Sequence, residues 1–464
     1  MNPTIEQQNI LDAVRGSKTD LMIRARAGTG KTSTLEMIDA AGGSTPYLLI
    51  CFNKTIAAEA TARMRPSTTV RNFNSIGHKI WAEHCHKKLT LNKSKLLDIY
   101  RALVDDADKS ERKHIWALYD QVTSAVNMAR SVGYIPDSHA KASKRLLDWP
   151  SLEHFLDETP VPEVRGLADR VLTTCITQAY AGTIDFNDQV YMPALFGGQY
   201  PMFPTVLIDE YQDLSPVNRA MVAKLCRNSR QIGVGDEAQA IYAFRGADAD
   251  AMPRAIADFS MEVLPLSVSF RCPEVITSNV HWHVPDIQSF RSGGIVESAE
   301  NPDIQPGAAV ICRYNAPLLH LALKLLAEVQ RVDVAGVDIG NRVIKLMSKL
   351  GPEDMTQAQT LHAIADWQAE RESLDSKSAG DMADCMRVFA RQGKTLSLAL
   401  AYARHIFAAT GEIKFMSGHR AKGLEFDHVY HLNSSSIGVG GQEPNIHYVI
   451  DTRPKARLTY IEAR

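Results

Sequence analysis

The sequence predicts an α/β protein with two parallel-sheet domains in tandem, each interrupted by a mainly helical insertion. Short apolar runs repeatedly end in small or acidic residues and lead into helical patterns, and this alternation is typical of parallel sheets. Two long polar stretches break the alternation with sequence that favours helices. A length of 464 residues with 45% hydrophobic side chains is enough for several packed cores.

The first domain is expected in two pieces, residues 1–81 and 180–263, around a helical insertion at residues 82–179. The insertion is polar and includes a basic stretch between His84 and Lys95. Strands are expected where apolar runs precede small or acidic residues. In this domain those runs are residues 21–23, 47–52, 206–208 and 231–234.

The second domain is expected at residues 264–325 and 412–464, around a reduced helical insertion at residues 326–411. Its strand-like runs are residues 308–312, 429–432 and 457–461. The sequence contains no repeat of fixed period and no low-complexity tract, which argues against a repeat architecture.

Composition excludes several classes of protein. The chain has 51 Lys and Arg against 53 Asp and Glu, so its net charge of −2 rules out a histone-like protein and an acidic disordered tail. A local basic groove would still be enough to bind nucleic acid. Seven cysteines without tight spacing indicate a reducing compartment rather than a disulfide framework. No signal peptide and no long apolar run are visible, so we expect a cytoplasmic protein without a membrane partner.

A glycine-rich segment between a predicted strand and a predicted helix has the context of a phosphate-binding loop. Gly28 and Gly30 allow backbone N–H groups to turn toward phosphate oxygens at a helix N-terminus. Lys31 can reach the β- and γ-phosphates, and the Thr32 hydroxyl can bind Mg²⁺. Ala25 stands where the strict pattern has its first glycine. The expected nucleotide-binding residues of this loop are Ala27, Gly28, Thr29, Gly30, Lys31, Thr32 and Ser33.

An acidic pair, Asp209 and Glu210, follows the apolar run at residues 206–208. Mg²⁺ prefers hard oxygen ligands, so Asp209 is the candidate metal-associated carboxylate beside Thr32. Glu210 is the candidate base that orients or deprotonates the attacking water. An acidic pair alone is usually a solvated turn, but the phosphate loop upstream favours an ATPase.

Three further polar residues are candidates for the catalytic set. Gln239 follows the strand-like run at 231–234 and could sense the γ-phosphate. Arg271 and Arg453 both belong to the second domain. Two arginines that face the phosphates held by the first domain would form a cleft gated by ATP.

In their order, these motifs resemble those of the UvrD/Rep-like superfamily 1 DNA helicases. The matching segments span nearly the whole chain, and their joint specificity is much higher than that of any single motif. They are Glu6-Gln7, residues 28–32, residues 209–213, residues 235–247, Phe270-Arg271, residues 419–427 and residues 448–453.

The resemblance implies two RecA-like domains that hydrolyse ATP with Mg²⁺. By this similarity Gln7 reads the adenine, Phe270 stacks on it, and Glu425 contacts the ribose. The implied catalytic residues are Lys31, Glu210, Gln239, Arg271 and Arg453, with Thr32 and Asp209 at the metal.

The resemblance also implies a surface for single-stranded DNA and duplex junctions, because bases stack on aromatic rings while cations hold the phosphates. Phe244 is the strongest candidate, since polar residues flank it in a loop-like segment. The full implied set is Phe52, Asn53, Phe73, Asn74, Tyr242, Phe244, Arg245 and His419, with Ser75 beside Asn74.

The resemblance implies a monomeric ATP-dependent helicase that moves 3′→5′ along DNA and acts in DNA repair or replication. The short insertion at 326–411 and the end of the chain eleven residues after Arg453 suggest a compact form, similar to phage proteins, without a following nuclease domain. Two other functions stay open: a DNA-stimulated ATPase switch that separates no strands, and an RNA-directed helicase. His84-Cys85-His86 and His281-Trp282-His283 have no second ligand pair at zinc-like spacing, so we expect no metal site there.

Overall fold

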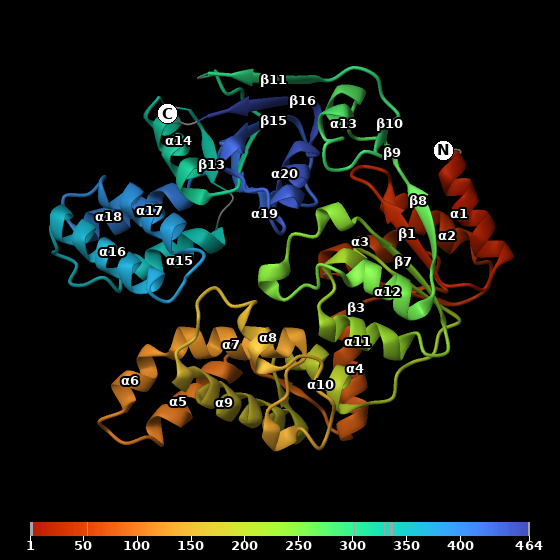
Figure 1. Cartoon of the computed structure of the whole chain (residues 1–464), viewed down its shortest axis with the longest axis horizontal. Coiled ribbons are helices and arrows are strands. Elements are labelled where there is room, and N and C mark those ends of the chain that lie inside the picture. The colour runs from red at the N-terminus through yellow and green to blue at the C-terminus, as the bar shows by residue number, and fades with distance from the viewer. Residues whose placement is uncertain (1–2, 53, 301, 329, 335–336, 463–464) are drawn as a thin grey trace. The chain divides into compact units, whose positions relative to one another are not determined.

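The computed structural model describes residues 3–52, 54–300, 302–328, 330–334 and 337–462 (Figure 1). The chain divides into two compact units. The first comprises Met1–Ala25 and Gly30–Leu266, and the second comprises Arg26–Thr29 and Ser267–Arg464.

A six-stranded parallel sheet forms the centre of the first unit, in the order β3-β2-β6-β7-β1-β8. Its central strands are nearly continuous apolar runs, as parallel strands covered on both faces require. All the strands run the same way, so the carboxyl ends of β1, β6 and β7 lie on one edge of the sheet. The strands are β1 (Leu21–Ala25), β2 (Tyr47–Cys51), β3 (Thr69–Asn72), β6 (Thr205–Ile208), β7 (Arg230–Gly235) and β8 (Glu262–Leu266).

The helices of the first unit fall into two groups. Five follow or precede the sheet strands: α1 (Ile5–Gly16), α2 (Lys31–Ala41), α3 (Lys54–Arg63), α11 (Pro216–Leu225) and α12 (Ala251–Phe259). The others lie between β3 and β6: α4 (Phe73–Cys85), α5 (Lys95–Asp105), α6 (Arg112–Ala117), α7 (Tyr119–Val132), α8 (Trp149–Glu153), α9 (Pro162–Ala181) and α10 (Asp188–Phe196). Two short strands, β4 (Thr90–Leu91) and β5 (Thr183–Ile184), pair within this helical region.

Buried polar contacts hold the helical region together. The Lys95 ammonium lies 2.6 Å from Asp188, and Arg130 lies 2.7 Å from Asp185. Trp81 of α4 is fully buried and donates its indole N–H to the carbonyl of Ala179 in α9. These contacts join α4 to α9, so the helical region starts earlier than residue 82 and extends beyond residue 179.

A second six-stranded parallel sheet forms the centre of the second unit, in the order β11-β16-β15-β12-β14-β13. Its strands are β11 (Ile295–Ala299), β12 (Ala309–Cys312), β13 (Val332–Val334), β14 (Ile413–Ser417), β15 (Phe426–Leu432) and β16 (Pro454–Ile461). The helices beside it are α13 (Glu274–Asn279), α14 (Asn315–Ala327), α19 (Gly418–Ala421) and α20 (Glu443–Asp451). Two short strands, β9 (Val268–Ser269) and β10 (Gln288–Ser289), form a separate pair.

The helical insertion of the second unit consists of α15 (Val337–Met347), α16 (Gln357–Glu372), α17 (Ala379–Ala390) and α18 (Leu396–Phe407). It shares a core with the sheet, in which Phe389 of α17 and Phe415 of β14 are both fully buried. Figure 1 shows these helices grouped together at one side of the second sheet.

The structure differs from the expected boundaries at two strands. β8 pairs in parallel with β1, so the first unit continues to Leu266 rather than ending at residue 263. β13 pairs with β14 in the second sheet, so the insertion expected from residue 326 begins only after this strand. Both strands are short. Their membership in a sheet depends on pairing with strands that are distant in the sequence, so the local pattern does not reveal it. Within the described residues, we find no helix with the length and apolar character needed to span a membrane.

Candidate functional site

The phosphate loop lies between β1 and α2, as the sequence predicts. Gly28 and Gly30 have φ angles of 73° and 80°, in the left-handed region that favours glycine. Residues 26–29 group with the second unit, in which the Phe270 N–H donates to the Gly28 carbonyl over 2.8 Å. A Cβ atom on Gly28 would lie 2.5 Å from Cβ of Arg271, so a side chain has no room there.

The loop's other expected residues differ in their exposure. Thr32 and Ser33 are exposed on the first turn of α2, where a hydroxyl can reach a metal ion. Thr29 is buried and donates its hydroxyl to the carbonyl of Arg26 over 2.8 Å. The Ala27 N–H donates to the hydroxyl of Tyr448 over 3.0 Å. Thr29 and Ala27 therefore contribute to the shape of the loop in this structure.

The carboxyl end of β6 brings Glu210 to the start of α2. Lys31 Nζ lies 2.6 Å from Glu210 Oε2. Glu210 has a φ of 49°, an uncommon conformation for a residue with a side chain, and its N–H donates to Asp209 Oδ1 over 2.9 Å. A locally strained backbone next to a paired charge is typical of a functional position.

Electrostatics at this edge of the sheet are governed by three carboxylates around one ammonium group. Burial alone would lower the pKa of Lys31, but Glu210, Asp209 and Asp236 together raise it above the usual lysine value. Burial, followed by the charge of Glu210, raises the pKa of Asp209 to about 7, although Lys31 opposes the shift. A buried carboxyl group with a raised pKa gains most from a divalent cation, because the cation compensates its charge.

Gln212 is a site residue that the sequence reasoning did not single out. It is 1% exposed and donates its amide to Glu210 Oε2 over 2.6 Å. Its carbonyl oxygen accepts from the N–H of Asp236 over 2.9 Å. Asp236 in turn accepts from the amide of Gln239 over 2.6 Å. Gln212 thus links the ends of β6 and β7, and its place inside the 209–213 segment was the signal that could have identified it.

Gln7 lies on α1 and is tied to α2. Its amide donates to Thr34 Oγ1 over 3.1 Å, and its carbonyl oxygen accepts from the N–H of Thr4 over 2.9 Å. Thr4 and Gln7 form a capping box at the start of α1, which explains the local conformation. Gln7 is therefore held next to the helix that begins with Lys31.

The second unit brings Arg271 and Glu425 together, although 154 residues separate them. Arg271 Nε lies 2.9 Å from Glu425 Oε2. The Phe270 ring is half-buried, and its centroid lies 5.2 Å from that of Phe290. Phe290 is 68% exposed, and the sequence reasoning did not identify it.

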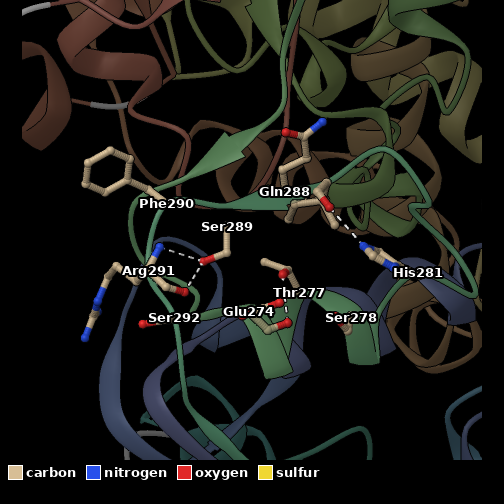
Figure 2. A pocket seen from close by; sticks show the side chains of 10 residues that line it. Glu274, Thr277, Ser278, His281, Gln288, Ser289, Phe290, Arg291 and Ser292 are labelled. Atoms are coloured by element: carbon tan, nitrogen blue, oxygen red, sulfur yellow. Dashed lines mark hydrogen bonds between the residues drawn. The ribbon is translucent and has the colours of Figure 1, made fainter.

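Phe290 also borders a polar hollow of about 450 Å³ between α13 and residues 287–292. Figure 2 shows Phe290 at one end of this hollow and His281 at the other. Arg291 holds the segment in place by donating to the carbonyl of Arg271 over 3.2 Å. This second aromatic ring belongs to a loop without a motif, so only tertiary contacts could identify it.

Arg453 is 1% exposed and lies just after α20. Its guanidinium donates to the carbonyl of Val449 over 2.8 Å and to that of Leu424 over 3.2 Å. In this structure the side chain therefore binds backbone carbonyls next to the end of a helix, where a cation is favoured.

Aromatic rings gather on the surface of the first unit. Phe52 and Tyr242 are stacked, with centroids 6.3 Å apart and planes 9° apart, and Phe244 lies 6.2 Å from Tyr242. Arg245 lies 5.2 Å from the Tyr242 ring and 5.4 Å from the Phe244 ring. Phe244 is 54% exposed, so it lies on the surface and not in the core. Exposed rings beside a guanidinium group are what single-stranded nucleic acid requires.

The other residues expected to bind DNA do not all lie in this aromatic group. The structure corrects the expectation for Phe73: it is 5% exposed and packs in the main core of the first unit as the first residue of α4, so it cannot stack on a base. Asn74 is half-buried and donates to the carbonyl of Phe186 over 2.6 Å. His419 lies in α19 of the second unit. Asn53 lies outside the described residues.

Comparison with known protein families shows which family the chain belongs to. A model of the UvrD/REP helicase N-terminal domain matches residues 6–260, which is more than half of the sequence. The chain belongs to the UvrD/REP helicase family. This membership agrees with the resemblance found in the sequence, and the two parallel sheets confirm the expected α/β fold with two parallel-sheet domains in tandem.

Individual relatives of this UvrD/REP-family chain are distant. It is similar to DNA helicase IV of Escherichia coli (strain K12), with 25% identity over 277 residues, 51% of this chain and 40% of the relative. It is similar to DNA helicase II of the same organism, with 23% identity over 300 residues, 58% of this chain and 38% of the relative. The chain thus spans about two fifths of the length of these relatives. The chain is also similar to a solved structure of the Arterivirus nonstructural protein 10 (helicase) with DNA. The match covers 97% of this chain and 63% of that chain, with 12% sequence identity and a TM-score of 0.37.

Proposed function

We propose that this UvrD/REP-family helicase is an ATP-dependent motor that moves along single-stranded DNA and separates duplex DNA. The observation that carries the proposal is the group at the carboxyl edge of the first sheet, where Lys31, Glu210 and Asp209 meet at the phosphate loop. A half-buried lysine beside two carboxylates at a helix N-terminus is the arrangement that binds phosphate and a divalent cation.

The residues of the first unit fit ATP and Mg²⁺. Asp209 and Thr32 would hold the metal ion, which when bound would neutralise phosphate charge. Lys31 binds the β- and γ-phosphates, and Glu210 orients the attacking water. Gln212 positions Glu210, because it holds the same carboxylate oxygen that Lys31 binds. Gln239 responds to the γ-phosphate, and Gln7 contributes to recognition of the adenine.

In the second unit, Arg271 and Arg453 stabilise charge on the transferred phosphoryl group, Phe270 stacks on the base, and Glu425 contacts the ribose. The Arg271–Glu425 ion pair at 2.9 Å supports a shared role for these two residues. We include Phe290 as a second ring for the base, because it packs beside Phe270 and is largely exposed.

Coupling to DNA follows from the short chain between Gln239 and Phe244. Gln239 ends one short 3₁₀ turn (Glu237–Gln239), and Phe244 lies in the next (Ala243–Arg245). A change at the phosphate end would therefore be transmitted over five residues to Tyr242 and Phe244, and Phe52 stacks on Tyr242. The rings hold single-stranded DNA by stacking while Arg245 neutralises a phosphate. By the resemblance, Asn74, Asn53 and His419 are further candidates for DNA binding.

Tailed duplexes test the proposal and its direction. We expect unwinding of a duplex with a 3′ single-stranded tail, because the proposed movement is 3′→5′, and little unwinding of the same duplex with a 5′ tail. Preference for the 5′ tail would overturn the direction. DNA-stimulated ATP hydrolysis without unwinding of either substrate would favour the ATPase switch, and stimulation by RNA alone would favour the RNA-directed helicase.

A further inference from the structure

A buried cluster in the second unit has no part in the proposed motor. It contains His431 of β15 and two residues of α20, His447 and Asp451. One candidate ligand atom from each residue lies within 4.8 Å of the other two. His431 and Asp451 are fully buried, whereas the side chain of His447 is 24% exposed. Charged and polar groups are rarely buried together without a partner or a ligand.

The fold brings these side chains together from separate segments. His447 and Asp451 are four residues apart, so they lie on the same face of α20. The strand β16 contributes Tyr460, which is opposite His431 in the sheet and donates its hydroxyl to Asp451 Oδ2 over 2.7 Å. Asn279 donates to the Tyr460 hydroxyl over 2.7 Å. These contacts fix the Asp451 carboxylate in place.

The ring nitrogens of the two histidines are unequally satisfied. His431 Nδ1 lies 2.7 Å from Asp451 Oδ1, so the carboxylate accepts a hydrogen bond from the ring N–H. Nε2 of His431 and Nε2 of His447 are both buried, and neither has a hydrogen-bond partner among the described residues. His447 Nε2 lies 3.7 Å from Asp451 Oδ2, so a metal ion that replaced the Nδ1 proton of His431 could bind His431 Nδ1, His447 Nε2 and the carboxylate together.

We propose that His431, His447 and Asp451 form a binding site for one divalent transition-metal ion of the zinc class. Imidazole nitrogens with a single carboxylate suit Zn²⁺, Co²⁺ or Ni²⁺, whereas Mg²⁺ prefers oxygen ligands. The site is therefore distinct in chemistry from the proposed Mg²⁺ site at Asp209. Zinc binds nitrogen at about 2.0–2.1 Å, so the three ligand atoms, which lie within 4.8 Å of one another, have to adjust their positions before one ion can contact them all.

Metal at this site would tie the C-terminal end of α20 to the central strand β15. Asp451 is followed by Thr452 and then Arg453, whose side chain is buried against α20. A bound ion would therefore stabilise the segment that carries Arg453 without contacting nucleotide.

Metal binding to the full chain tests this inference without any measurement of ATP hydrolysis. The protein is treated with a chelator, dialysed, and titrated with Co²⁺ in the presence of excess Mg²⁺. We expect one Co²⁺ per chain, a visible absorption spectrum typical of nitrogen ligation, and a rise in the melting temperature. Zn²⁺ should displace the Co²⁺ and abolish the spectrum, because the two ions share ligand preferences.

Variants make the test specific. His447→Gln, at the partly exposed position, should keep the fold and weaken Co²⁺ binding about 100-fold or more. The control is His428→Gln on the same strand, β15. His428 lies three residues before His431, so its side chain points to the other face of the sheet, where it bonds to Thr459 and not to the proposed metal site. Wild-type protein without saturable binding, or His447→Gln protein that binds as wild type does, would overturn the proposal. Glu210→Gln should bind Co²⁺ normally, so loss of the ATPase does not affect the outcome.

Discussion

Lys31 Nζ and Glu210 Oε2 lie 2.6 Å apart, which pairs the ammonium group expected to bind phosphate with the carboxylate expected to activate water. Gln212 donates to the same carboxylate oxygen. A phosphate group that binds Lys31 therefore competes with Glu210 for the same cation. On this basis nucleotide binding would release Glu210 from the ion pair while Gln212 continues to position it.

The first prediction separates charge from shape at this ion pair. Lys31→Ala should abolish ATP hydrolysis and also lower the free energy of unfolding by about 2 kcal/mol, because three carboxylates lose their shared cation. Glu210→Gln should slow hydrolysis severely but retain nucleotide binding and stability, since it keeps the side chain's size and removes repulsion with Asp209. Thermal unfolding, nucleotide binding and steady-state hydrolysis measure the three effects. Turnover of Glu210→Gln at the wild-type rate would show that Glu210 is not the base.

The second prediction concerns pH and Mg²⁺ at Asp209. Its pKa is raised in the folded protein to about 7, above the usual carboxyl value near 4. The contribution of this group to stability is therefore fully present below pH 4 and is lost as the pH rises through about 7. Mg²⁺ binds the charged form, so it should raise the melting temperature more at pH 8 than at pH 5.5. Asp209→Asn should remove this pH dependence, and an equal effect of Mg²⁺ at both pH values would contradict the assignment.

The third prediction concerns Arg453. Its bonds to backbone carbonyls mean that Arg453→Ala should lower the free energy of unfolding by about 3 kcal/mol, in addition to any effect on the reaction. If the guanidinium also stabilises the transition state, turnover should fall about 1,000-fold while nucleotide affinity changes little. Both constants should be measured below the melting temperature of the variant. Parallel losses of affinity and turnover would mean that Arg453 only supports the fold.

The fourth prediction concerns Phe244. Phe244→Ala should weaken binding of single-stranded DNA about ten-fold, because stacking on one ring contributes about 1–3 kcal/mol per base. Unwinding should suffer more than ATP hydrolysis at saturating DNA, since the phosphate-binding residues stay in place. The melting temperature should not change, because the ring is 54% exposed.

Phe73 provides the matched control for Phe244. Phe73→Ala removes a core ring and should lower the free energy of unfolding by roughly 3–5 kcal/mol. Fluorescence anisotropy with labelled DNA and thermal unfolding compare the two variants directly. Early melting of Phe244→Ala together with equal loss of both activities would show that this ring is structural.

Local sequence was enough to predict the elements that carry the chemistry. The phosphate loop could be recognised because Gly28 and Gly30 allow left-handed conformations that other residues resist, and because the strand before them and the helix after them have different apolar periods. The surface position of Phe244 could be predicted because polar residues flank it within a few positions. These properties depend on neighbours along the chain.

Tertiary structure alone decided which residues meet across the chain. Phe73 and Phe244 are both aromatic residues in expected DNA-binding segments, but Phe73 packs in the main core of the first unit, whereas Phe244 lies in a short 3₁₀ turn and is exposed. Pairing with β1 assigned β8 to the first sheet, and the ends of β6 and β7 placed Gln212 between Glu210 and Asp236. His431, His447 and Asp451 come together only because β15 and α20 pack against each other. A side chain's local sequence sets its conformational preferences, whereas its partners depend on contacts between segments that no local pattern encodes.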